Sequence, residues 1–148
     1  MERREFVLGC LALGLSGCAP SGPGVVTVLA QGVAGMNPGP GGEDRPLTLQ
    51  IVQLRSAGAF DSVDFFALQN PAAALGAEFI KADQVALTAG GPKTLTIGLD
   101  AGTTVIGVIA GFRDPAGKTF RGKIAVSATE SVTLAVAVTK SGVTLRAG

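Results

Sequence analysis

The chain has 148 residues, a formal net charge of +1 and no histidine, tryptophan or tyrosine. This length suits one ordinary domain, and a near-neutral charge without a basic block gives no support for nucleic-acid binding. The absence of histidine excludes His-based metal sites and the Ser-His-Asp and Cys-His arrangements of nucleophilic catalysis. The 22 glycines, with many threonines and valines, favour a compact β protein with tight turns.

The N-terminal segment has the three-part layout of a secretory signal peptide. Two arginines precede an apolar run that begins at Phe6 and ends in Leu15-Ser16-Gly17-Cys18. These last four residues resemble the lipobox of bacterial lipoproteins, in which the cysteine is lipidated and becomes the new N-terminus. A cysteine thiolate is the nucleophile suited to forming a thioether with a diacylglyceryl group. We therefore expect a signal peptide at residues 1–17, a covalent lipid on Cys18 and no other cofactor.

The same segment leaves the export route open. Residues 3–6 resemble a twin-arginine export motif, but Glu2 and Leu8 depart from that pattern, and paired arginines are ordinary in other signal peptides as well. Cys10 leaves with the signal peptide, so we expect no intrachain disulfide in the mature chain. Ala19 stands where an Asp can retain lipoproteins at the inner membrane in some bacteria, which points to the outer membrane.

Residues 18–24 are expected to form a lipidated tether, and no later apolar run reaches the ~18 residues needed to span a bilayer. The folded domain is expected at residues 25–148, beginning with a β-branched strand at residues 25–29. Residues 35–46 contain three prolines and four glycines, which predicts a long exposed loop. In the strand expected at residues 47–54 the apolar pattern changes phase, which predicts a β-bulge near Ile51-Val52.

Residues 56–80 predict a helical insertion of two short helices between strands. Val63 and Phe66 share one helical face, Asn70-Pro71 is an N-cap followed by proline at the first helical position, and Gly76 supplies a left-handed stop. The phenylalanines of this insertion are expected to pack in the core. They are Phe60, Phe65, Phe66 and Phe79.

The remaining chain is predicted to form strands separated by tight turns. Leu95, Ile97 and Leu99 alternate with small or polar residues, as in a half-buried strand, and residues 132–138 alternate in the same way. Residues 104–112 are apolar on both faces, which predicts a central strand. Further strands are expected at residues 84–87, 120–126 and 143–145.

About eight strands with frequent turn signals favour an all-β fold with a small helical insertion, built as a two-sheet antiparallel β-sandwich. A small barrel is the alternative. The short connections between strands leave no room for the crossover helices that a parallel sheet needs.

Catalytic interpretations find little support in the residues. Asp61 and Asp64 lie at an expected helix start, and Asp100 and Asp114 are turn formers. A two-carboxylate glycosidase site stays open because any pair could converge in space, but such sites usually add the aromatic platforms that this chain lacks. The glycine doublets lack the sequence and strand-to-helix context of a phosphate loop. We therefore expect a binding or structural protein, not an enzyme, with no catalytic or metal site and no small-molecule substrate.

The ordered set of motifs resembles one family, the type VI secretion lipoproteins called TssJ, VasD or SciN. No single motif is specific, but their order along the mature chain is. The set comprises the lipobox, Val-Thr-Val-Leu-Ala at residues 26–30, Met36-Asn37-Pro38 with a Gly/Pro-rich stretch to Arg45-Pro46, Ile-Val-Gln-Leu at 51–54, Asp-Phe-Phe-Ala-Leu at 64–68, and residues 106–114, which end in Phe-Arg-Asp.

The resemblance implies a transthyretin-like two-sheet sandwich with a small added helical part. It also implies a lipoprotein on the periplasmic face of the outer membrane that holds the periplasmic domain of TssM, in a complex completed by TssL. In the family, the loop between the first two strands contacts TssM, and here that loop is residues 35–46. The candidate contact residues are Met36, Asn37, Pro38, Glu43, Asp44 and Arg45.

Arg45 is the best single candidate, because its planar guanidinium can make bidentate contacts and Arg is enriched at interface hot spots. The alternative interpretation is a stand-alone periplasmic lipoprotein whose transthyretin-like domain binds a small molecule or a carbohydrate.

Overall fold

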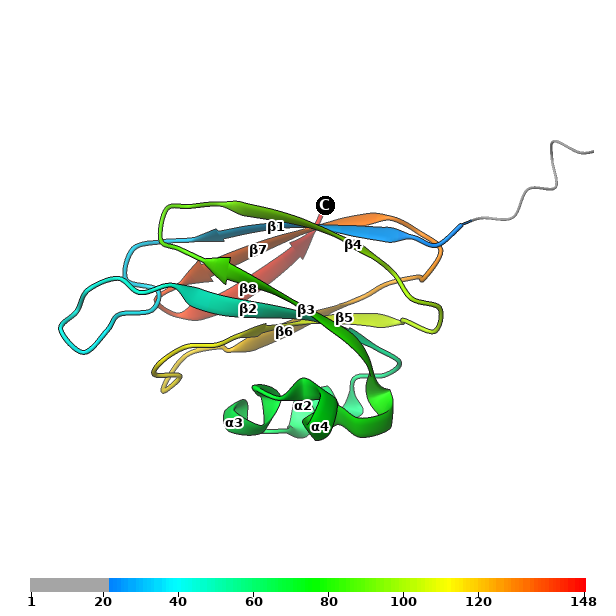
Figure 1. The fold of residues 1–148 in the computed structure, drawn as a ribbon, viewed down its shortest axis with the longest axis horizontal. Coiled ribbons are helices and arrows are strands. Elements are labelled where there is room, and N and C mark those ends of the chain that lie inside the picture. Colours follow the sequence, from blue (N-terminus) through cyan, green and yellow to red (C-terminus); the bar gives the residue numbers. More distant parts are fainter. Residues whose placement is uncertain (1–21) are drawn as a thin grey trace, which may run out of the picture.

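The computed structural model describes residues 22–148, so the predicted signal peptide, the lipidation site Cys18 and most of the tether lie outside the described residues. Eight strands form two four-stranded sheets, with strand orders β4-β1-β7-β8 and β3-β2-β5-β6. The sheets pack face to face, and a group of short helices covers one of them (Figure 1). The predicted two-sheet sandwich with a helical insertion is confirmed. No helix within residues 22–148 has the length and apolar character to cross a membrane.

The elements follow one another in this order along the chain: β1 (Val25–Gly32), β2 (Leu47–Leu54), α2 (Gly58–Ser62), α3 (Phe65–Leu68), α4 (Pro71–Leu75), a 3-10 turn η1 (Gly76–Glu78), β3 (Phe79–Leu87), β4 (Lys93–Gly98), β5 (Val105–Ala110), β6 (Arg121–Ala125), β7 (Val132–Thr139) and β8 (Gly142–Ala147). β3 begins five residues earlier than the sequence pattern predicted, at Phe79 instead of Gln84.

The main core lies between the two sheets and is built by strands whose side chains alternate. In β7, Leu134, Val136 and Val138 are buried, whereas Ala135 and Ala137 are exposed on the outer face. This is the alternation that the sequence predicted, and it follows from the two-residue period of a strand. β5 lies between β2 and β6 and is almost entirely buried, so the predicted central strand is also confirmed.

One pair of strands is parallel. β1 runs parallel to β7, with Val28 opposite Leu134, while the other strand pairs of the described residues are antiparallel. The argument that short connections exclude parallel pairing was wrong here. The chain leaves β1, passes through strands of both sheets and returns to lie beside β1 as β7, so the pair needs no crossover helix.

The phase change in β2 has a different cause from the one predicted. Ile51 and Val52 pair in continuous register with both neighbouring strands, and the register shift lies at Gln53/Leu54. The predicted bulge at Ile51-Val52 was therefore wrong. β2 is apolar in both phases because Ile51 packs between the sheets, whereas Val52 and Leu54 pack in a second core beneath the helices.

The helical insertion contains three short α-helices and a 3-10 turn, where two helices were expected. Pro71 stands in the first turn of α4 and Gly76 follows it with φ of 56°, as predicted, but Asn70 makes no capping hydrogen bond with its side chain. The prediction that Phe66 packs in the core was wrong. Asp64 starts a separate helix, α3, in which Phe65 is buried and Phe66 is 77% exposed.

Candidate functional site

The β1–β2 loop, residues 33–46, is the longest connection between successive strands of the described residues that contains no helix, and it projects from one end of the sandwich (Figure 1). It is a small hairpin with its own hydrogen bonds. Pro38 and Asp44 form a β-bridge, the N–H of Gly39 donates to the carbonyl of Glu43 at 2.7 Å, and the N–H of Gly42 donates to the carbonyl of Gly39 at 2.9 Å. Gly42 has φ of 86°, which favours glycine at this turn. The loop is therefore ordered as well as exposed.

An ion pair stiffens the tip of the hairpin. The Nε and Nη2 of Arg45 donate to Oε2 of Glu43 at 3.0 and 2.9 Å, and both side chains are about half exposed. The N–H of Gly41 donates to the other oxygen of the same carboxylate. The pKa of Glu43 is lowered below its ordinary value of 4.5, first by a hydrogen bond from its own backbone N–H and then by the Arg45 guanidinium. The Glu43 carboxyl is thus charged at neutral pH.

Two of the predicted contact residues form the base of the hairpin and are buried. Met36 is 0% exposed, and its sulfur packs so closely on Gly32 that a Cβ there would lie 2.2 Å away. Asn37 is 5% exposed, and its Nδ2 donates to the carbonyl of Pro46 at 2.9 Å. The prediction that Met36 and Asn37 offer their side chains to a partner is therefore wrong for this structure. Their side chains fix the loop to the sandwich instead.

The other four predicted residues lie at or near the surface. Glu43, Asp44 and Arg45 are exposed, and Pro38 is half-buried. Asp44 also has a local role, because its Oδ1 accepts a hydrogen bond of 2.7 Å from the N–H of Gly35. The structure thus brings an arginine and two carboxylates together on one rigid hairpin.

A second loop, residues 111–120 between β5 and β6, holds the hairpin from the side. The N–H of Arg113 donates to Oδ1 of Asn37 at 2.8 Å, and its Nε donates to the carbonyl of Pro38 at 2.9 Å. The Nζ of Lys118 donates to the carbonyls of Met36 and Lys140. The sequence analysis missed these roles of Arg113 and Lys118, although it singled out the Phe-Arg-Asp stretch that contains Arg113.

Four connections lie at this end of the molecule, and hydrogen bonds link them. We call them the loop end. They are the β1–β2 loop, the β3–β4 turn (residues 88–92), the β5–β6 loop and the β7–β8 turn (residues 140–141). The N–H of Gly90 donates to the carbonyl of Gly32, and the N–H of Thr119 donates to the carbonyl of Ser141. The tip of the hairpin therefore stands on a base that several loops hold in place.

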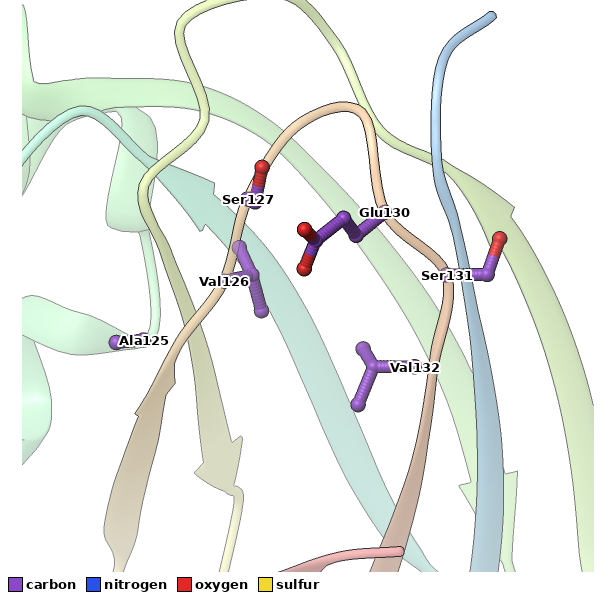
Figure 2. A pocket seen from close by; sticks show the side chains of 6 residues that line it. All are labelled: Ala125, Val126, Ser127, Glu130, Ser131 and Val132. Atoms are coloured by element: carbon purple, nitrogen blue, oxygen red, sulfur yellow. The ribbon is translucent and has the colours of Figure 1, made fainter. Parts of the chain in front are cut away.

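A shallow hollow lies elsewhere, beside the turn from β6 to β7 (Figure 2). Glu130 extends across it toward Val126, and the other residues of its lining are small or apolar, with two serines. Glu130 is the one carboxylate in this lining, so the hollow lacks the pair that glycoside hydrolysis requires. Among residues 22–148, no group of three or more His, Cys, Asp or Glu side chains is arranged to hold a metal ion. The hairpin is therefore the stronger candidate site.

The comparisons with known proteins agree with this fold. Residues 25–141 match the model of the family described as "Type VI secretion lipoprotein, VasD, EvfM, TssJ, VC_A0113". A comparison with curated proteins finds no match.

Solved structures with the same fold belong to type VI secretion systems. TssJ1 from Pseudomonas aeruginosa, a type VI secretion lipoprotein, is 26% identical, with a TM-score of 0.78 over 86% of this chain and 98% of that chain. Lip from Serratia marcescens is 25% identical, with a TM-score of 0.77 over 84% of this chain and 96% of that chain. A chain from a type VI membrane complex is 24% identical, with a TM-score of 0.74 over 84% of this chain and 99% of that chain, a likeness that shows the fold alone.

The fold and the site define a β-sandwich domain that presents an ordered, charged hairpin at one end and carries a helical insertion on one sheet. With the family match over most of its length, the chain belongs to the type VI secretion lipoproteins, the family of TssJ and VasD. It is thus a membrane-associated structural component of a type VI secretion system, as the motifs of the sequence indicated.

Proposed function

We propose that this lipoprotein is anchored in the outer membrane, on its periplasmic face, and holds the periplasmic domain of TssM by protein–protein contact, in a complex completed by TssL. The observation that carries the proposal is the β1–β2 hairpin, whose tip is exposed and whose base is buried. A loop that is ordered before binding loses little conformational entropy when a partner docks on it. The function is then contact, not catalysis.

The proposed anchor is a lipid on Cys18, and the position of the hairpin suits it. Residues 22–24 lead into β1 at the end of the sandwich opposite the hairpin (Figure 1). β1 has eight residues, which at about 3.3 Å per residue separates the two ends by roughly 26 Å. A lipid near the first end leaves the hairpin directed away from the membrane, toward partners in the periplasm. The Serratia marcescens protein, described as a membrane-bound component of its secretion system, supports the membrane anchor.

The proposed contact uses the exposed part of the hairpin. Arg45 can add a bidentate contact to a partner carboxylate, because a guanidinium offers more donors than its pair with Glu43 uses. The carboxylates of Glu43 and Asp44 and the half-buried ring of Pro38 complete the exposed surface of the hairpin. Met36 and Asn37 contribute indirectly, because they hold the backbone that presents these groups.

The contact is tested by binding the full-length lipoprotein, in detergent, to the purified periplasmic domain of TssM. Arg45→Glu should weaken this binding by about tenfold or more, since reversing an interface charge replaces an attraction with a repulsion. Arg146→Glu is the matched control, because Arg146 is an exposed arginine outside the loop end and should bind like the wild type. If both variants bind as tightly as the wild type, the hairpin is not the contact surface.

The anchor is tested separately by labelling cells with a fatty-acid analogue. Wild-type protein should incorporate the label and fractionate with the outer membrane, whereas Cys18→Ser should incorporate none and accumulate as unprocessed precursor. Label in the Cys18→Ser variant would refute the site, and wild-type protein in the inner-membrane fraction would refute the sorting proposal.

A further inference from the structure

Phe66 is the most exposed large hydrophobic side chain of the described residues. It is 77% exposed, compared with 46% for Val33 and 44% for Leu29. A single exposed apolar residue is common on protein surfaces and has no meaning by itself. The surroundings of Phe66 distinguish it, because its position is fixed and its neighbour Phe65 packs on Phe120, a residue of the loop end.

Two interactions hold Phe66 in place. The side chain of Asp64 caps helix α3 by accepting a hydrogen bond of 2.8 Å from the N–H of Ala67. The ring of Phe66 packs edge-to-face against Phe65, with centroids 5.3 Å apart, and Phe65 packs in the same way against Phe120, with centroids 5.1 Å apart. The exposed ring is therefore the outermost of three aromatic rings that pack edge-to-face.

The β5–β6 loop links these three rings to the hairpin. Phe120 belongs to the β5–β6 loop, and two residues earlier in that loop Lys118 donates to the carbonyl of Met36 at the hairpin base. On the other side of α3, Gln69 accepts a hydrogen bond at its carbonyl from Gln50 of β2. In Figure 1, α3 lies below the sheets and is the helix nearest to the end of the sandwich from which the β1–β2 loop projects. The surface around Phe66 thus extends the loop end onto the helical insertion.

Arg113 lies in the same β5–β6 loop as Phe120 and supplies a charge at the loop end. It is exposed, and of its guanidinium nitrogens only Nε has a hydrogen-bond partner among the described residues. The terminal amino groups remain available as donors to a carboxylate. Aromatic residues, phenylalanine included, and arginine are both enriched at protein interfaces.

We propose that Phe66 is an aromatic anchor for the same partner protein that docks on the hairpin, and that this partner receives the ring in an apolar pocket with a carboxylate placed to meet Arg113. The inference rests on the proposed function, since it extends that interface from the hairpin to α3. The helical insertion then takes part in recognition as well as covering the outer face of a sheet.

The test measures the affinity of the full-length lipoprotein, in detergent, for the TssM periplasmic domain. Phe66→Ala should weaken binding by about 10- to 100-fold, the range for an aromatic hot spot. Leu29→Ala is the control, because Leu29 is an exposed apolar residue on the outer face of the other sheet, and its affinity should stay within about twofold of the wild type. Thermal unfolding of both variants should match the wild type, because neither side chain is buried.

The outcomes separate this inference from the proposed function. If Phe66→Ala binds like the wild type while Arg45→Glu does not, the hairpin contact stands and the proposed role of Phe66 in the interface is refuted. If wild-type protein does not bind the TssM domain, the proposed function is refuted, and the proposed role of Phe66 is refuted with it. If Phe66→Ala keeps its affinity for the TssM domain but loses retention on phosphatidylethanolamine–phosphatidylglycerol vesicles, Phe66 contacts lipid, which also refutes the inference.

Discussion

The base and the tip of the β1–β2 hairpin differ in what their residues do, although both come from one Gly/Pro-rich segment. At the base, Met36 and Asn37 are buried: Met36 packs on Gly32 of β1, and Asn37 bonds to Pro46 and to Arg113 of the β5–β6 loop. At the tip, Glu43 and Arg45 are exposed and bond mainly to each other and to the hairpin backbone. The difference implies that substitutions at the base change stability, whereas substitutions at the tip change recognition.

Removing the Met36 side chain is expected to have the largest effect. Met36→Ala leaves a cavity beside Gly32 and Leu87 in the main core, which should reduce the free energy of unfolding by about 2–5 kcal/mol. Chemical denaturation of the purified domain measures this. Val33→Ala in the same loop is the control and should change stability by no more than about 0.5 kcal/mol, because Val33 is exposed. Equal losses in the two variants would show that the base is not part of the core.

A smaller loss is expected when the hydrogen bonds of the base are removed. Asn37→Ala leaves the N–H of Arg113 and the carbonyl of Pro46 without their partner, which should cost about 1–3 kcal/mol. Arg113→Ala is the informative comparison, because it removes the Nε bond to Pro38 but keeps the backbone N–H that donates to Asn37. It should therefore destabilise less than Asn37→Ala in the same denaturation experiment. The reverse order would mean that the Arg113 side chain, and not Asn37, fixes the hairpin.

The sequence pattern was sufficient to predict features that repeat locally. It did not predict contacts between distant residues. The alternation of Leu134, Val136 and Val138 is a property of one strand, so the buried face of β7 could be predicted without knowledge of the fold. The burial of Asn37 depends on Arg113, which lies 76 positions away, and composition alone indicated an exposed loop. The prediction that Phe66 is buried was wrong because a separate helix begins at Asp64, so Val63 and Phe66 do not share one helical face.

The tip should tolerate changes that the base does not. Replacing Pro40 and Gly41 by serine while keeping Gly42, whose φ is 86°, removes no core side chain and keeps the positive-φ position. Thermal unfolding should therefore match the wild type. A loss as large as that of Met36→Ala would contradict the division between base and tip, because it would show that the tip also supports the core.

The last expected effect is on the ionisation of Glu43. In the fold its pKa is lowered from the ordinary 4.5, partly by a hydrogen bond from Arg45, so the charged form is favoured. The stabilisation is present above the unfolded pKa and is lost as the pH falls through the folded pKa, which places the change in the acid range below about 4.5. Arg45→Ala should raise the pKa of Glu43 toward its ordinary value, as measured by NMR titration of the side-chain carboxyl. It should stay somewhat below that value, because the backbone N–H groups of Glu43 and Gly41 remain as donors. An unchanged pKa would show that Arg45 does not pair with Glu43 in solution, and all five donors of the guanidinium would then be available to a partner.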